Sequence, residues 1–453
     1  MAIIASTLKR IESDPLSFLG GAEFVNQRFA SVGHVWRDRL LDPARTLGLF
    51  VIQVLNGNTA ITHLRHLGTI AVANSSYCAA RARLPLLGVA AMVDALTDAA
   101  SKHNSPTWCG RRVFIADASS TLLPDTKKQQ KVYPQPSAQK PGCGFPMIKI
   151  LGLMNALTGI IVHATMMAMN VHELSVTDGI HAVLRAGDVL LGDRGFCSFA
   201  HLAMLEKIAV KAVFRAHQNQ IIDFNIRRAH RMSKDEREQR GIPSSRFVCK
   251  LGTDDQIVDW VAPATQATWM SLAFFLTLPK TIRVREIRYY IHPPKGYRTN
   301  VVTIVTTLLD PIEFPKEEIA KLYGLRWQIE LNFRHLKTTM NMEHLKCKTV
   351  DGTAKELMVF MLVYNLIRSV MCQAAAQQGI EDANRISFID ALRWLCAQLT
   401  PTPTGELGDL IVNPIREPRF CPRVLKKRMK PYDLMTKPRH MYREPQENHE
   451  IMR

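Results

Sequence analysis

Residues 111–120 read RRVFIADASS, an apolar run of the kind found in β-strands, and it ends at Asp117. A second run of the same kind, DVLLGDRGF at residues 188–196, ends at Asp193. Open α/β sheets carry reactive groups just past the carboxyl ends of their buried strands. Aspartate at the end of a strand is also common turn chemistry, so either run alone indicates little.

The stretch YGLRWQIELNFRHLK, residues 323–337, places polar groups at helical spacing. Tyr323 is followed by Arg326, Glu330 and Lys337 at offsets of three, seven and fourteen residues, which on a regular α-helix form one narrow stripe. Carboxylate oxygens bind Mg²⁺, and Arg and Lys bind phosphate, so metal and nucleic acid are natural partners for such a stripe. A solvated helix face is an equally good interpretation of this stretch alone.

Two strands that end in aspartate, followed by a helical glutamate, form a pattern. Asp117, Asp193 and Glu330 come from distant parts of the chain and could converge to hold two divalent metals about 3.5–4 Å apart.

With these motifs the chain resembles the DDE transposases of bacterial insertion sequences, specifically the insertion sequence 4 family. The family signature Y-x2-R-x3-E-x6-K matches at all four of its positions, and the likeness extends from about residue 45 to about residue 440. One departure follows Asp117, where many relatives have a small residue and then Thr. In this chain Ala118, Ser119 and Ser120 stand there instead. Further similarity lies in Asp193–Phe196, Thr303–Asp310, Leu322–Glu330 and Glu356–Arg368.

The resemblance implies a ribonuclease-H-like core and two-metal phosphoryl transfer on double-stranded DNA. It assigns Asp117, Asp193 and Glu330 as catalytic ligands of two Mg²⁺ (or Mn²⁺) ions. Similar enzymes cut at the terminal inverted repeats of their element and join the freed 3′ ends to target DNA, and they act as homodimers. The remaining residues of the motifs are expected to contact DNA: Tyr323, Arg326, Lys337 and Arg194.

Composition agrees with a nucleic-acid partner. The 453 residues carry 58 Lys and Arg against 40 Asp and Glu, a net charge of +18, which favours a polyanion. The longest apolar run, near Leu357–Ile367, contains Asn365 and is too short to cross a membrane. Nine scattered cysteines without a C-x-x-C pair indicate reduced thiols in a cytoplasmic, nucleoid-associated protein and no zinc site.

The order of apolar runs predicts an α/β fold with five regions, in which an insertion interrupts the catalytic core. They are a helical N-terminal DNA-binding region at 1–105, the first core segment at 106–217, a β-rich insertion domain at 218–300, the second core segment with the catalytic helix at 301–371, and a helical C-terminal region with a basic tail at 372–453. The insertion is expected because 137 positions between Asp193 and Glu330 are too many for a simple connection.

Two short helices predicted at 59–67 and 75–84 resemble a helix-turn-helix, with Asn74 as a plausible N-cap of the second. Arg81 and Arg83 on the second helix are candidate DNA contacts. An ordinary helical bundle with surface arginines explains the same pattern.

The insertion contains a charged stretch at 227–240, which is typical either of a DNA-tracking surface or of a solvated loop. It is followed by four predicted strands, the third at Ser271–Thr277. Its aromatic residues are candidates for stacking on a flipped base, although a core role is the simpler interpretation of both tryptophans. They are Trp260, Trp269 and Tyr297.

Two other functions remain open from the sequence. One is a catalytically inactive, transposase-derived DNA-binding protein, and the other is a metal-dependent DNA nuclease or resolvase with the same core. The presence of all three carboxylates favours an active transposase.

Overall fold

The computed structural model describes residues 19–37, 39–67, 72–102, 107–227, 243–291, 300–398 and 405–415. The described residues of the N-terminal region, between 19 and 102, form mainly helices. Asp42 caps α3 by accepting a hydrogen bond from the Arg45 backbone N–H. Asn74, expected as an N-cap, is instead the first residue of its helix. The elements are α2 (Gly21–Ser31), α3 (Pro43–Leu55), η2 (Ile61–His63), α4 (Leu64–Leu67), α5 (Asn74–Arg83) and α6 (Leu86–Lys102).

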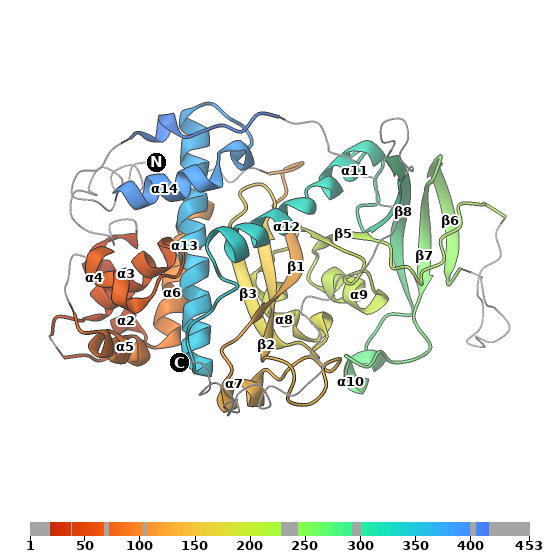
Figure 1. Cartoon of the computed structure of the whole chain (residues 1–453). Coiled ribbons are helices and arrows are strands. Elements are labelled where there is room, and N and C mark those ends of the chain that lie inside the picture. Colours follow the sequence, from red (N-terminus) through yellow and green to blue (C-terminus); the bar gives the residue numbers. More distant parts are fainter. Residues whose placement is uncertain are drawn as a thin grey trace, which may run out of the picture.

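Nine strands form one mixed sheet in the order β3-β2-β1-β4-β5-β9-β8-β7-β6 (Figure 1). Strands β1, β4 and β5 run parallel to one another, and all other neighbouring strands are antiparallel. The fold is therefore mixed α/β, as predicted. The strands are β1 (Val113–Leu122), β2 (Met147–Asn155), β3 (Ile161–Ala168), β4 (Val189–Gly192), β5 (Lys211–Arg215), β6 (Ser245–Gly252), β7 (Asp255–Val261), β8 (Thr281–Ile291) and β9 (Asn300–Thr306).

The strands expected to form a separate insertion domain extend the same sheet. Strand β9 lies between β5 and β8 and is hydrogen-bonded to both, so β8, β7 and β6 continue outward from it. Ile304 of β9 faces Arg215 of β5 on one side and Ile287 of β8 on the other. The region 245–291 thus shares a sheet with the core, which differs from the expected separate domain.

The prediction of a strand at Ser271–Thr277 is wrong, because this segment forms the short helix α10 (Leu272–Leu276) and its two caps. The Ser271 side chain accepts a hydrogen bond from the backbone N–H of Phe274 and so satisfies one of the free donors of the first turn. An apolar run of this length fits either structure by hydrophobicity alone, and the serine cap favours the helix.

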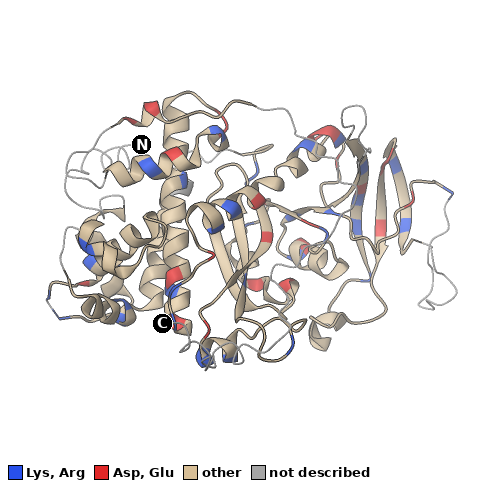
Figure 2. Cartoon of the chain, in the orientation of Figure 1, with Lys and Arg blue, Asp and Glu red and all other residues tan. Residues whose placement is uncertain are grey.

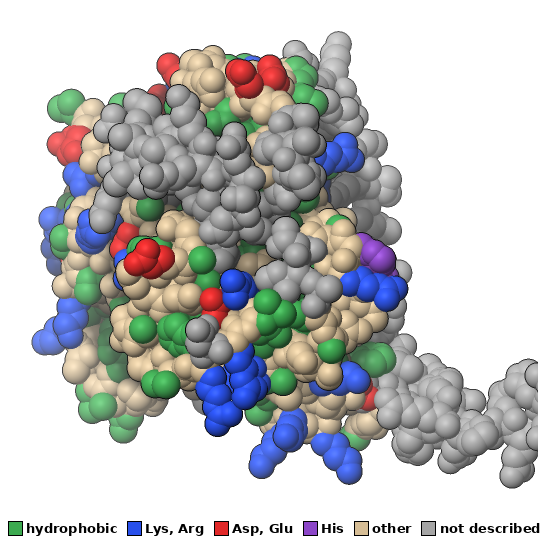
Figure 3. Space-filling view, turned by 90° about the vertical axis from the view of Figure 1, so that its left-hand side faces the viewer, with side chains coloured by type: hydrophobic (Ala, Val, Ile, Leu, Met, Phe, Trp, Pro, Cys, Tyr) green, Lys and Arg blue, Asp and Glu red, His purple; other side chains and the backbone are tan. Residues whose placement is uncertain are grey.

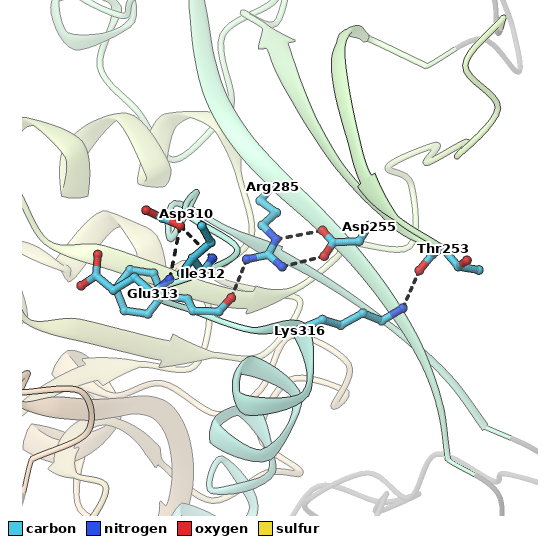
Figure 4. Close-up of polar contacts among 8 residues, drawn as sticks. Thr253, Asp255, Arg285, Asp310, Ile312, Glu313 and Lys316 are labelled. Atoms are coloured by element: carbon cyan, nitrogen blue, oxygen red, sulfur yellow. Dashed lines mark hydrogen bonds and ion pairs between the residues drawn. The ribbon is translucent and has the colours of Figure 1, made fainter.

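A buried ion pair fastens the extension of the sheet to the segment that precedes α11 (Lys316–Gly324). Arg285 of β8 is 1% exposed and holds both carboxylate oxygens of Asp255 on β7, at 2.8 and 2.6 Å. The same guanidinium donates to the carbonyl oxygen of Phe314 at 2.7 Å, and Lys316 donates to the carbonyl oxygen of Thr253 (Figure 4). These bonds fix where α11 begins relative to β7 and β8.

Two hydrophobic cores cover the two faces of the sheet. The long helix α13 (Val350–Gln377) fills the first core together with α3, α6 and α14 (Phe388–Gln398). Helices α8 (Asp178–Val183) and α9 (Phe199–Lys207) belong to the second core (Figure 1). The remaining short helices are α7 (Lys127–Val132), η3 (Glu173–Val176), η5 (Ala383–Arg385) and η6 (Leu407–Asp409).

Helix α13 is long and apolar enough to cross a membrane by length and composition alone. However, 78% of its most apolar 18-residue window is buried inside the protein. Asn365, the polar residue noted in the sequence, accepts a hydrogen bond from the backbone N–H of Ile161 and donates one to its carbonyl oxygen. The helix is therefore a core helix whose polar side chain anchors it to β3.

Candidate active site

Asp117 and Asp193 lie in the same row of two neighbouring parallel strands. Ile115 of β1 is paired with Leu191 of β4, and each aspartate lies two residues further along its strand direction. Asp193 directly follows β4, as predicted, whereas β1 continues to Leu122. Asp117 therefore lies within its strand and not past its end, and β4 stops early enough to leave room beside it.

The Asp117 carboxyl group is partly buried and is influenced by the other two predicted carboxylates. Its side chain is 22% exposed, and this burial raises the pKa of Asp117 to about 7. The backbone N–H of Ala118 lowers the pKa, Asp193 raises it, Arg326 lowers it and Glu330 raises it. The charges of Asp193 and Glu330 thus both act on the Asp117 carboxyl group.

The predicted continuous helix at 323–337 is divided into three segments. Helix α11 ends at Gly324, α12 spans Trp327–Arg334, and a π-helical turn follows at His335–Thr339. Between α11 and α12, successive backbone N–H groups bond three residues back, which tightens the turn. The tight turn and the wide π turn both change the rotation per residue, so the simple stripe expected from a regular helix does not continue to Lys337.

Helix α12 crosses the sheet next to the two aspartates. Asp117 is paired in register with Gly152 of β2, and a Cβ atom at residue 152 would lie 3.2 Å from the ring of Phe333. Glycine at this position therefore lets α12 approach the sheet closely. Acidic and basic segments lie together where α12 passes β1 (Figure 2).

Arg326 connects two of the three carboxylates. Its guanidinium lies 3.0 Å from Oε1 of Glu330 and 3.8 Å from Oδ2 of Asp117. The Arg326 side chain is 10% exposed, whereas that of Glu330 is 48% exposed. The positive charge offsets the repulsion between two carboxylates that would otherwise be costly to hold close together.

Tyr323 and Lys337 have different surroundings. Tyr323 is 5% exposed and belongs to the first core, so the stripe is neither a fully solvated helix face nor wholly accessible to a ligand. Burial raises the pKa of Tyr323 above its usual value, while Arg326 and Arg215 oppose that shift. Lys337 in the π turn lies 3.7 Å from Glu343. The structure thus buries Tyr323 in the first core and pairs Lys337 with an acid other than the three predicted carboxylates.

The loop after β4 is held by short contacts. Oδ1 of Asp193 accepts a hydrogen bond from the backbone N–H of Gly195 at 2.7 Å, and Arg194 donates to Gln218 at 3.3 Å. The Nδ1 atom of His201 lies 2.8 Å from the carbonyl oxygen of Phe196. These contacts orient the Asp193 carboxylate and leave Arg194 half-exposed.

The two N-terminal arginines separate in the structure. Arg81 is 9% exposed, stacks over the ring of Phe50 at 3.7 Å, and donates to Gln53 at 3.0 Å and to Cys347. Its contacts join the N-terminal helices to the loop before α13, so its position is that of a structural residue. Arg83 is exposed.

Arg83 also borders a hollow of about 730 Å³ beside α5, together with His34, Trp36, Arg37 and Arg39. The face that carries α3, α4 and α5 has groups of Lys and Arg side chains, several of them along its lower part (Figure 3). A basic hollow of this kind suits a polyanion.

The three aromatic residues named for the insertion also differ. Trp260 is 3% exposed and donates to Glu286 at 2.8 Å, so it is a core residue. Trp269 is half-buried and stacks on His172. Tyr297, all of the charged stretch at 227–240 except its first residue, and the basic tail from residue 416 lie outside the described residues.

The sequence analysis missed a residue at the centre of the site. Trp327 begins α12, is 56% exposed, and has the Arg326 guanidinium 4.3 Å from its ring centre. No local pattern in the sequence shows this exposure, which leaves the Trp327 ring accessible next to Arg326 and three residues before Glu330.

The donor set fits a hard divalent cation, since it consists of three carboxylates from Asp117, Asp193 and Glu330. Within the described residues, no three Asp, Glu, His or Cys side chains are already arranged closely enough to hold a metal ion. Instead, the guanidinium of Arg326 is paired with oxygens of Asp117 and Glu330. A bound cation would compete with Arg326 for those oxygens.

Comparison with known proteins agrees with this geometry. The family model described as "Transposase DDE domain" matches residues 108–366, which include all three carboxylates. The chain belongs to the DDE transposase family. The transposase InsG for insertion sequence element IS4 of Escherichia coli (strain K12) is 25% identical over 356 residues, covering 74% of this chain and 73% of InsG. The resemblance to the insertion sequence 4 family is thereby confirmed.

A solved structure of the piggyBac transposase in a synaptic complex with hairpin DNA is 11% identical to this transposase. The matched region covers 85% of this chain and 80% of the piggyBac chain, with a TM-score of 0.46.

Proposed function

We propose that this transposase cuts double-stranded DNA at the terminal inverted repeats of an insertion sequence and joins the 3′ ends to target DNA. The observation that supports the proposal is that Arg326 lies against both Asp117 and Glu330, while Asp193 occupies the position next to Asp117 on the neighbouring strand. Three remote carboxylates are costly to hold together unless their charge is used. Family membership supports the same reaction class.

In this proposal the three carboxylates hold two Mg²⁺ (or Mn²⁺) ions. When bound, the ions activate water or a 3′-hydroxyl and stabilise the leaving oxygen. With the carboxylates occupied, Arg326 would be free of Glu330 and would bind a DNA phosphate, because a guanidinium can contact two phosphate oxygens at once. Lys337, Arg194 and the hydroxyl of Tyr323 are proposed to bind neighbouring phosphates.

The raised pKa of Asp117 predicts that Mg²⁺ binding to the metal-free protein releases a proton. At about pH 6, below the pKa of about 7, Asp117 is mostly protonated, and the cation binds the carboxylate form. Isothermal titration calorimetry in buffers of different ionisation enthalpy should detect release of roughly one proton at about pH 6 and almost none at about pH 8.5.

The Asp117→Asn variant is the control, since it has no proton to release. Equal proton release by the variant and the wild type at about pH 6 would contradict the assignment.

The raised pKa of Asp117 also predicts that the free energy of unfolding falls as the pH rises from about 4 to about 7, because the folded state binds the proton more tightly than the unfolded state in that range.

The function is tested by incubating the protein with the DNA repeats that flank its own gene and Mg²⁺. The proposal predicts nicks at the repeat ends followed by joining of the 3′ ends to a second DNA. Cleavage without joining would favour a nuclease or resolvase with the same core. Binding without cleavage would favour a transposase-derived DNA-binding protein.

Trp327 is proposed to stack on a base next to the cleaved bond. Stacking of one base on an aromatic ring is worth about 1–3 kcal/mol, so Trp327→Ala should slow end cleavage by roughly 5- to 150-fold. Trp327→Phe should keep most of the rate because a ring remains. Single-turnover cleavage of end DNA measures the effect, and an alanine variant that cleaves like the wild type would exclude the role.

The strand order supports a ribonuclease-H-like core built from residues 106–217 and 301–371. Strands β1 to β5 lie in the order 3-2-1-4-5, with β2 antiparallel and β4 parallel to β1.

We further propose that Arg83 and its basic hollow contact DNA ends, that the protein acts as a homodimer, and that it works at the nucleoid. Helices α3 and α6 pack against α13, so the N-terminal region belongs to the same body.

A further inference from the structure

The row that contains Asp117 and Asp193 continues into a third parallel strand. Gly192 of β4 is paired with Phe214 of β5, and the next residue on each strand is Asp193 and Arg215. Paired residues of parallel strands point to the same face of a sheet. Arg215 therefore follows the two aspartates along the same edge.

The alternation of side chains along each strand shows on which face of the sheet Arg215 lies. On β4 and β5, Leu191 and Val213 belong to the first core, whereas Leu190 and Phe214 belong to the second. By this alternation Arg215 lies on the face of the first core, where α11 and α12 cross the sheet. This is the face on which Arg326 contacts Asp117.

Tyr289 of β8 reaches the same place from the extension of the sheet. Ile304 of β9 is paired with Arg215 and with Ile287, and Tyr289 lies two residues beyond Ile287, on the same face. Burial raises the pKa of Tyr289, and both Arg215 and Arg326 oppose that shift. Arg215 also acts on Tyr323, so the guanidinium lies near both phenols.

Arg215 differs from Arg326 in its partners. Arg326 is paired with Asp117 and Glu330, whereas Arg215, which is half-exposed, has no carboxylate partner among the described residues. A guanidinium that is partly buried next to two phenols and lacks an anion carries uncompensated positive charge. An anion with several oxygens would satisfy it, and a phosphate matches its planar donor geometry.

We infer that Arg215 and Tyr289 form a binding site for one phosphate of the DNA strand, next to Asp193. The inference rests on the proposed function, since it places the substrate of that reaction. Arg215 holds the phosphate through its guanidinium, and the Tyr289 hydroxyl donates a hydrogen bond to the same group. The strand then passes along the carboxyl edge of β5 and β8, with the cleaved bond in front of Asp117 and Asp193.

The test uses end DNA in which single phosphates near the cleavage site are replaced by uncharged methylphosphonates. Wild-type cleavage should slow at the position that Arg215 contacts. Arg215→Gln should slow cleavage of ordinary end DNA by roughly 10²-fold, the effect of losing one well-placed donor to a reacting group. In Arg215→Gln the methylphosphonate at that one position should cause no further loss.

Two variants complete the experiment. Arg215→Lys keeps the charge and should recover part of the rate and of the methylphosphonate effect. Arg393→Gln, at an exposed position of α14, is the matched control and should behave like the wild type. The inference is overturned if Arg215→Gln cleaves like the wild type, or if it is slow but retains every methylphosphonate effect. Failure of the wild type to cleave would instead contradict the proposed function.

Discussion

Alanine at Asp117, at Asp193 or at Glu330 reduces cleavage of end DNA by roughly 10³-fold or more, because each change removes one of three ligands that position the metals. DNA binding persists, since the basic surface is unchanged. Single-turnover cleavage and a gel-shift assay on the same end DNA measure the two quantities. This expectation follows from the mutual influence of the three groups at Asp117.

Glu317→Ala provides the control for this series. Glu317 lies exposed on α11, the helix that precedes α12 and its Glu330. Its loss should leave cleavage unchanged. A Glu330→Ala variant that cleaves at the wild-type rate would show that α12 contributes no ligand.

Arg285→Met lowers the free energy of unfolding by about 3–5 kcal/mol, because it leaves the buried carboxylate of Asp255 without its partner. It also removes the hydrogen bond to the carbonyl oxygen of Phe314, which holds the start of α11. Urea unfolding followed by tryptophan fluorescence measures the loss. Since β8 shares the core sheet, the whole protein should lose stability, not only the extension.

The double variant Arg285→Met, Asp255→Leu should recover much of this loss, because no buried charge then lacks a partner. Arg283→Gln is the matched control on the same strand. Arg283 is 54% exposed and paired with Asp259, so its replacement should change stability little. If Arg285→Met unfolds like the wild type, or if only a local transition shifts, the continuous sheet would be contradicted.

Much of the sheet could be predicted because hydrophobicity and strand-forming residues agree in it. The run before Asp193 and the run before Asp117 are strands, as their apolar, β-branched composition indicated. Ser271–Thr277 was predicted as a strand because a short apolar run fits both structures, and the cap by Ser271 decided for the helix. The place of β9 between β5 and β8 could not be predicted, since strand order depends on contacts between distant residues.

The three carboxylates were candidates in the sequence because apolar runs and helical offsets are local patterns, although Asp117 lies within its strand and not at its end. The role of Arg326 as a partner of Asp117 was not visible, since it depends on how α12 crosses the sheet. Arg215 gave no local signal either. Its relation to Asp193 appears only in the pairing of β4 with β5, and its relation to Tyr289 only through β9.

The most direct test of the account is iron-mediated cleavage of the protein itself. Fe²⁺ replaces Mg²⁺ in the presence of end DNA, and ascorbate with peroxide then generates radicals that cut the backbone near the bound ion. The account predicts three cuts together, near Asp117, Asp193 and Glu330, all suppressed by excess Mg²⁺ and all lost in Asp193→Ala. Cuts at one or two of these segments only, or at other places, would contradict a single site built from all three.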